Sequence, residues 1–129
     1  MAADVIDAAA RVLGSAATSV TRDVPLLDAR PPAGQEATYA CTDEGALHLE
    51  DYLERRTRLA LTAPDRGLSA AAPAAAAMAS ALGWSRERER AEVDAWHARI
   101  AARRAAEAEP DDERALAAYR AVLAEGAAV

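Results

Sequence analysis

Residues Gly45–Arg58 read G-A-L-H-L-E-D-Y-L-E-R-R-T-R and combine apolar and charged positions more regularly than any other segment of the chain. Leu49, Tyr52 and Leu53 recur at the spacing of one helix face. The charged positions form two pairs in which an acid precedes a base by four residues, Asp51 with Arg55 and Glu54 with Arg58. The segment therefore predicts an amphipathic helix, which we expect to continue to about Leu61.

On either side of this segment, helical patterns alternate with clear breaks at glycine and proline. A short alternating run over 57–62 resembles a strand, but the chain offers no second strand to pair with it. The fold class is therefore predicted to be all-α, a single compact domain with five to seven helices packed at large angles. We expect these helices over residues 4–13, 16–22, 35–44, 46–61, 69–82, 86–109 and 111–125.

Helix ends are expected at residues whose chemistry favours them. Asp4, Ser69 and Ser85 are predicted to cap the N-termini of three helices, and Gly14 and Gly83 to end two. Pro73 follows Ser69 closely, and because proline lacks an amide hydrogen we place it in the first turn of the alanine-rich helix. These breaks define the predicted helices more sharply than composition alone.

The composition predicts a thin core. Hydrophobic residues make up 52% of the chain, but 38 of them are alanine, there is no phenylalanine, and leucine, isoleucine and valine together number 21. Alanine favours helix but buries little surface. We expect Val93, Trp96 and Ile100 to form one buried stripe, and Leu26 and Leu27 to add to the core from a loop.

Several signals occur in a specific order around the central segment. Tyr39-Ala40 and the acidic pair Asp43-Glu44 precede it, and Pro64-Asp65-Arg66-Gly67, an alanine-rich helix and Leu82-Gly83-Trp84 follow it. In this order the chain resembles the C-terminal helical domain of FAD-dependent glycerol-3-phosphate dehydrogenases. The likeness runs from about residue 14 to 104 and is strongest over 39–67. It implies such a domain over residues 1–109, and beyond the resemblance we expect residues 110–129 to form a helical extension packed on that domain.

The resemblance implies a non-catalytic domain that caps or buttresses the flavin-binding domain of an enzyme oxidising glycerol-3-phosphate to dihydroxyacetone phosphate. FAD would belong to that parent enzyme, and the flavin-binding domain would be the partner, with homo-oligomers as a further expectation. The alternative is a free-standing helical interaction module derived from the same domain. The reading frame upstream of Met1 would distinguish the two, because a flavin domain encoded in frame would support the first.

The residues themselves offer no catalytic, cofactor-binding or metal site. The sequence contains no G-x-G-x-x-G turn to cradle a dinucleotide pyrophosphate. His48 and His97 are the only histidines and lack a second ligand at a recognisable spacing, and Cys41 is expected to be a small buried residue. Whether the chain by itself forms part of a working oxidoreductase stays open.

The charge and the hydropathy of the chain limit which partners and which compartment we expect. The net charge of −6 disfavours nucleic acid, and the acids interleave with the arginines. The chain opens with no basic-then-apolar leader, and no apolar run is long enough to span a bilayer. We therefore expect a cytoplasmic protein, with the parent enzyme at the cytoplasmic face of the membrane as a further option.

Four arginines could contact an anion or a partner surface: Arg55, Arg56, Arg58 and Arg66. Arg55 and Arg58 have acids four residues earlier and are expected to be neutralised by them. Arg56 has Tyr52 at that position instead, and we expect it to reach an acidic partner. We favour structural or interface roles over a ligand site because helical charge pairs are common.

Overall fold

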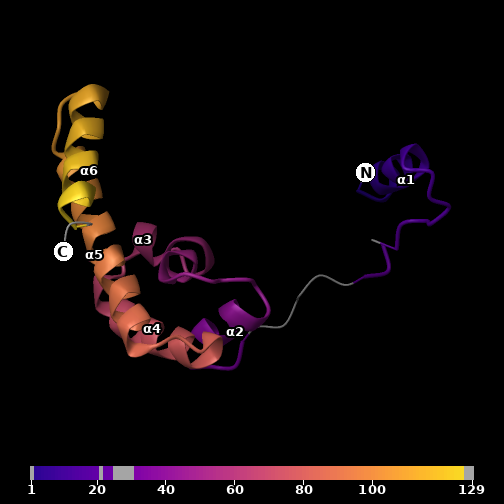
Figure 1. Cartoon of the computed structure of the whole chain (residues 1–129), viewed down its shortest axis with the longest axis horizontal. Coiled ribbons are helices and arrows are strands. Elements are labelled where there is room, and N and C mark those ends of the chain that lie inside the picture. The colour runs from indigo at the N-terminus through magenta and orange to yellow at the C-terminus, as the bar shows by residue number, and fades with distance from the viewer. Residues whose placement is uncertain (1, 21, 25–30, 127–129) are drawn as a thin grey trace. The chain divides into compact units, whose positions relative to one another are not determined.

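A computed structural model describes residues 2–20, 22–24 and 31–126, and all regular structure in these ranges is helical (Figure 1). The predicted all-α class is confirmed, and the number of helices in the described ranges lies at the upper end of the expected five to seven. The expected large crossing angles stay a prediction. In chain order the helices are α1 (Ala2–Val12), α2 (Glu36–Thr42), the π-helix η1 (Asp51–Arg56), α3 (Leu59–Thr62), α4 (Leu68–Leu82), α5 (Arg86–Glu107) and α6 (Asp112–Gly126).

The chain divides into two compact units, which we call the N-terminal unit (Met1–Arg30) and the helical body (Pro31–Val129). In the N-terminal unit, α1 is followed by Gly14 in the left-handed conformation, with φ 71°, as predicted. Asp4 lies inside the first turn instead of capping it, because the helix begins at Ala2. The helix predicted over 16–22 is wrong for residues 16–20, which are irregular. Leu26 and Leu27 lie outside the described residues.

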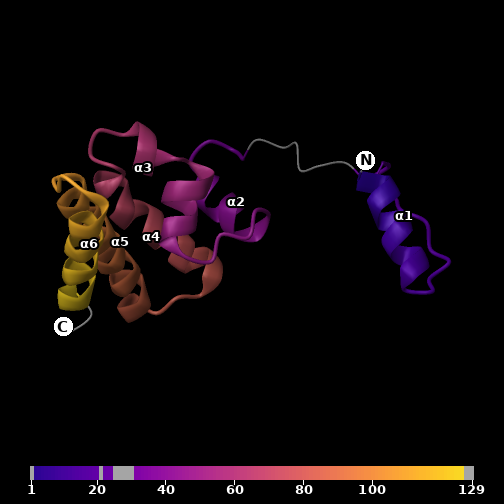
Figure 2. The same ribbon diagram turned by 90° about the horizontal axis from the view of Figure 1, so that it is seen from above.

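The core of the helical body is small, as the composition predicts. Its largest fully buried side chains come from the central segment, α4 and α5, and they are Leu49, Leu53, Met78, Trp96 and Ile100. Alanines of α2 and α4 fill the space between them. α4 packs against both α2 and α5, while α6 lies along α5 as its antiparallel neighbour (Figures 1 and 2).

The prediction of one continuous helix from the central segment to Leu61 is wrong. η1 ends where the Thr57 amide donates to the Tyr52 carbonyl, five residues back, at a distance of 2.9 Å. Arg58 then adopts the left-handed conformation, with φ 59°, and α3 starts after it. The break turns the chain so that Ala60 is buried while Leu61 points outward with 68% of its surface exposed.

The turn Pro64-Asp65-Arg66-Gly67 forms as predicted, but its acid caps the next helix. The Asp65 carboxylate accepts hydrogen bonds from the Gly67 amide at 3.0 Å and the Ser69 amide at 2.8 Å. Ser69 is therefore capped and is not the cap. Pro73 lies inside α4, beyond its first turn. The carbonyl that it leaves without an intrahelical donor belongs to Ser69, which is exposed to water.

The start of α5 follows the sequence prediction. Gly83 has φ 68° and ends α4, and the Ser85 hydroxyl accepts a hydrogen bond from the Arg88 amide at 3.1 Å. The last helix, α6, is capped by Asp111, whose carboxylate accepts from the Arg114 amide at 2.9 Å. Leu116 of α6 stays 48% exposed. The boundary at 109/110 stays a prediction.

Candidate functional site

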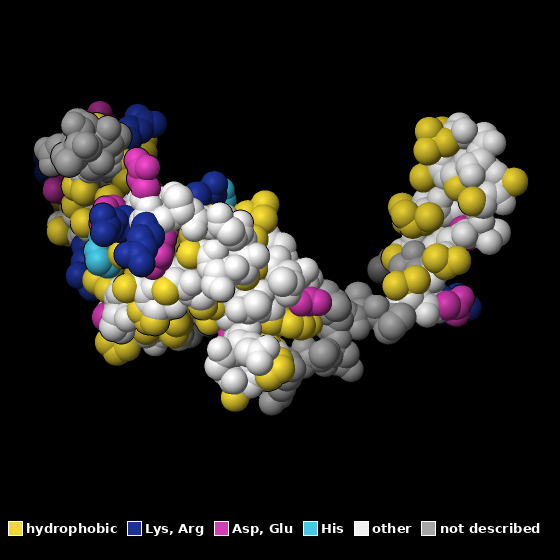
Figure 3. Space-filling view, turned by 60° about the horizontal axis from the view of Figure 1, so that its bottom comes forward, with side chains coloured by type: hydrophobic (Ala, Val, Ile, Leu, Met, Phe, Trp, Pro, Cys, Tyr) yellow, Lys and Arg dark blue, Asp and Glu magenta, His cyan; other side chains and the backbone are white. Residues whose placement is uncertain are grey.

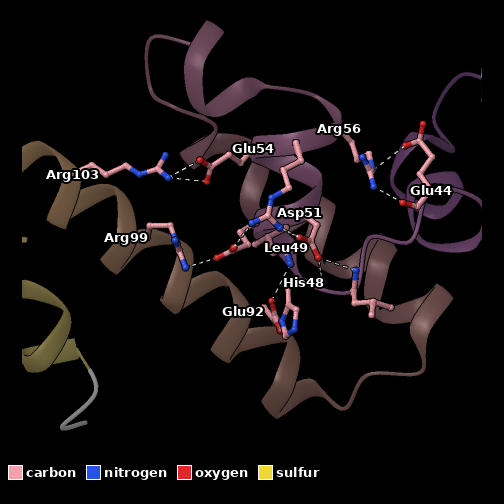
Figure 4. A network of polar contacts seen from close by, with 12 residues as sticks. Glu44, His48, Leu49, Asp51, Glu54, Arg56, Glu92, Arg99 and Arg103 are labelled. Atoms are coloured by element: carbon pink, nitrogen blue, oxygen red, sulfur yellow. Dashed lines mark hydrogen bonds and ion pairs between the residues drawn. The ribbon is translucent and has the colours of Figure 1, made fainter. Parts of the chain in front are cut away.

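The densest polar contacts of the helical body join the central segment to α5 (Figure 4). Glu50 pairs with Arg99, and the two Glu54 carboxylate oxygens lie 2.7 and 2.8 Å from Nη2 of Arg103. Glu50, the residue before η1, and Glu54 within it thus face two arginines four residues apart on α5. We call these two pairs, together with the Glu92 contacts described next, the polar seam.

Glu92 of α5 caps the turn that leads into η1. Its Oε2 accepts a hydrogen bond from the Leu49 amide at 2.9 Å, and its Oε1 lies 2.9 Å from Nδ1 of His48. Arg88 approaches the same carboxylate at 3.4 Å. Only 14% of the Glu92 side chain is exposed, so this cap is a partly buried contact between segments 43 residues apart.

Asp51 caps the same turn from within the segment. Its Oδ2 accepts hydrogen bonds from the Leu47 amide at 3.1 Å and the His48 amide at 3.0 Å. Burial of the carboxyl acts to raise the pKa of Asp51. These two hydrogen bonds and the Arg55 charge outweigh burial, so the pKa is lowered from its ordinary value. The backbone ahead of η1 therefore depends on two carboxylates, Asp51 and Glu92.

Of the two arginines with an acid four residues earlier, one pairs with that acid and the other does not. Arg55 pairs with Asp51, as predicted, and also lies 3.5 Å from Glu50. The predicted pairing of Arg58 with Glu54 is wrong, because Glu54 is engaged by Arg103. Among the described residues no side-chain partner faces Arg58, which is exposed and occupies the left-handed break.

The other two arginines hold the helical body together. Arg56 donates to the Glu44 backbone carbonyl, and its Nε lies 3.7 Å from the Glu44 carboxylate, so an acid of the helical body already faces it although none lies four residues earlier. Arg66 binds both carboxylate oxygens of Glu107 at 2.7 and 2.6 Å, which fastens the turn before α4 to the end of α5. Three of the four predicted arginines face different acids, and Arg58 faces none among the described residues, so the structure does not assemble the four into one anion site.

A cavity of about 190 Å³ opens beside the polar seam. Its charged walls are already paired with one another, and the buried Trp96 indole nitrogen has no hydrogen-bond partner among the described residues. No group of three residues able to hold a metal ion occurs in the part of the chain that is described. These paired charges can hold the central segment and α5 in register. The cavity is lined by His48, Glu50, Ala91, Glu92, Ala95, Trp96 and Arg99.

Sequence reasoning missed every contact of the seam. The available signal was the match between Glu50 and Glu54 on one helix and Arg99 and Arg103 on another, both spaced by four residues. Cys41, by contrast, is buried as predicted, and burial raises the pKa of its thiol. His48 contacts Glu92 of α5.

Comparison with known proteins identifies the family of this chain. Residues 3–89, well over half of the chain, match the family model for the C-terminal domain of alpha-glycerophosphate oxidase. The chain belongs to this family. The match runs from α1 into the first turn of α5, so Arg99, Arg103 and α6 lie beyond it. The resemblance drawn from the central segment and its flanks is confirmed.

Individual proteins of known name are similar to this chain over a longer stretch than the family model. Glycerol-3-phosphate dehydrogenase of Mycobacterium leprae is 42% identical over 101 residues, and glycerol-3-phosphate dehydrogenase 2 of Mycobacterium tuberculosis is 40% identical over 101 residues. Each alignment covers 78% of this chain but only 17% of the relative. No solved structure matches the chain significantly. Within the described residues, no helix is both long and apolar enough to cross a membrane.

Proposed function

We propose that this chain acts as the non-catalytic C-terminal accessory domain of an FAD-dependent glycerol-3-phosphate dehydrogenase. The observation that carries the proposal is the family match over residues 3–89 to a domain that is C-terminal in its own enzyme. The matched relatives are dehydrogenases of which the chain spans 17%. The partner is accordingly the flavin-binding part of the parent enzyme, the remainder of such a dehydrogenase.

In the parent enzyme, FAD would accept the electrons when glycerol-3-phosphate is oxidised to dihydroxyacetone phosphate. This chain's own residues have a different task. The acids and arginines of the polar seam are paired with each other, which fixes the central segment on α5. A rigid helical body of this kind suits a domain that supports a neighbouring catalytic domain, because its side chains are positioned before contact.

The proposal extends to location and assembly. We place the parent enzyme in the cytoplasm, at the cytoplasmic face of the membrane when its electron acceptor is a membrane quinone. Contacts between the accessory domains of two subunits would let the enzyme form a homo-oligomer. Both statements follow from the family resemblance and not from a site in this chain.

A chimeric enzyme tests the proposal. The segment of the Mycobacterium leprae dehydrogenase that matches this chain is replaced by the 129 residues, and the unaltered relative serves as control. The chimera should retain FAD and oxidise glycerol-3-phosphate, because the accessory domain would be replaced by an equivalent one. The isolated chain should show neither a flavin spectrum nor activity.

Two results would overturn the proposal. An isolated chain that purifies with bound flavin would assign cofactor binding to these 129 residues. A chimera that loses FAD and activity while the relative keeps both would favour the alternative, a free-standing helical interaction module.

A further inference from the structure

The central segment carries a kink that its own residues do not favour. η1 is a π-helix, which is a rare conformation, and Arg58 after it has φ 59°. Residues other than glycine adopt this left-handed backbone only at a cost. In a straight helix, by contrast, Glu54 and Arg58 would form the predicted acid-before-base pair, and Arg58, Leu59 and Ala60 all favour helix. We call residues Asp51–Thr62, with their break at Arg58, the kinked segment.

Thr57 satisfies backbone groups at the kink. Its hydroxyl lies 3.0 Å from the Tyr52 carbonyl oxygen and 3.4 Å from the Leu53 carbonyl oxygen. The Leu59 amide donates to the same hydroxyl at 3.4 Å. An uninterrupted α-helix would supply each of these groups with a backbone partner. The threonine side chain therefore offsets part of the cost of the kink.

Two ion pairs from the last turns of α5 flank the kink. Before the kink, Nη2 of Arg103 lies 2.7 and 2.8 Å from the two Glu54 carboxylate oxygens (Figure 4). After it, Glu107 binds Arg66, in the turn that follows α3, at 2.7 and 2.6 Å. Residues four apart lie on one face of a helix, so a single face of α5 holds both sides of the kink. We call these two pairs the clamp.

The clamp selects between two partners of Glu54. Arg103 takes the carboxylate that a straight helix would give to Arg58, and Arg58 has no side-chain partner among the described residues. Straightening the segment would also displace the turn at Arg66, which Glu107 opposes. The kinked segment lies inside the family match, whereas Arg103 and Glu107 lie beyond its end at residue 89. Residues outside the matched stretch thus fix the shape of a segment within it.

We propose that the clamp holds the central segment in its kinked form, and that the segment straightens into one helix from Leu49 to about Leu61 when the clamp opens. The two forms differ in the partner of Glu54 and in the backbone conformation at position 58. Because α6 packs along α5, a molecule that displaces these C-terminal helices would change the shape of the central segment. The inference is independent of the proposed function, because it concerns contacts within this chain alone.

The test begins with Arg103→Gln in the 129-residue chain, examined by NMR. Glutamine favours helix about as well as arginine, so the variant removes the charge without weakening α5. The amide–α-proton coupling at Arg58 should lose its positive-φ value, and helical carbon shifts should run without interruption across residues 57–59. Arg99→Gln is the matched control, because Arg99 pairs with Glu50, ahead of η1, and does not flank the kink. It should leave Arg58 with a positive φ.

A second substitution tests whether the backbone at position 58 is the element that changes. Glycine adopts the left-handed conformation freely and is a poor helix former. Adding Arg58→Gly to Arg103→Gln should therefore restore the kink, seen as non-helical carbon shifts at Thr57 and Leu59. General destabilisation of the core would not be reversed by a glycine at this position.

Salt tests the same equilibrium without altering the clamp. Basic and acidic side chains lie beside one another on the face of the helical body seen in Figure 3. Both clamp pairs are partly exposed, with 26% of the Arg103 side chain and 55% of the Glu107 side chain accessible, so added salt screens them. In the unaltered chain, salt should move the carbon shifts of residues 57–59 toward helical values. The Arg58→Gly chain should not respond.

Three results would overturn the inference. A folded Arg103→Gln chain in which Arg58 keeps its positive φ would show that the clamp does not hold the kink. Carbon shifts at residues 57–59 that ignore salt in the unaltered chain would show the same. An Arg103→Gln chain that does not fold would show that Arg103 is needed by the whole fold and does not select between two forms of one segment.

Discussion

Replacing Glu92 with alanine should weaken the attachment of the central segment to α5. The variant leaves the partly buried Leu49 amide without the acceptor that now lies 2.9 Å away. An unsatisfied donor of this kind costs about 1–3 kcal/mol. The lost contact with His48, whose side chain is 59% exposed, adds at most about 1 kcal/mol. We expect a loss of about 2 kcal/mol, which lowers the melting temperature of a body of this size by roughly 8–16 °C.

Glu92→Gln is the control, because it keeps an oxygen that can accept from the Leu49 amide and removes only the charge. Its loss should be less than half that of Glu92→Ala. Urea unfolding followed by circular dichroism measures both losses, and hydrogen exchange at the Leu49 amide reports the cap directly. A loss under about 0.5 kcal/mol for Glu92→Ala, with unchanged exchange at Leu49, would refute the claim that α5 holds this turn.

Three further perturbations have defined outcomes. Leu53→Ala, at a fully buried position, should cost about 2–5 kcal/mol by urea unfolding, against under about 0.5 kcal/mol for Leu61→Ala, and equal losses would contradict the assigned core. The lowered pKa of Asp51 stabilises the fold above the ordinary carboxyl pKa, and this stabilisation is lost as the pH falls below about 4. Asp51→Asn should therefore flatten the acid dependence of the unfolding midpoint, and an unaltered slope would exclude that contribution. Cys41, buried and with a raised pKa, should react with a thiol reagent far more slowly in the native chain than in urea, and equal rates would place the thiol at the surface.

Local signals in the sequence predicted local structure well. The Ser85 cap, the Gly83 stop and the burial of Trp96 and Ile100 all depend on residues within one or two turns of each other. The family was also accessible, because the order of the signals around the central segment is itself local information. What the sequence could not supply was the choice among competing partners.

The central segment illustrates that competition. A pair four residues apart on an exposed helix is worth only a few tenths of a kcal/mol, so Glu54 is easily taken from Arg58 by a partner on another helix. Arg103 is such a partner, and both side chains of that pair are less than one third exposed. Likewise, the left-handed turn at Arg58 depends on burying Ala60, a consequence of packing that no helical period reveals.

The pairing of these arginines within the helical body limits how a partner surface could use them. Arg55, Arg56 and Arg66 each face an acid of the helical body, and a partner carboxylate could recruit one only by separating an existing pair. Desolvating a charge and breaking its contacts would offset much of the gain.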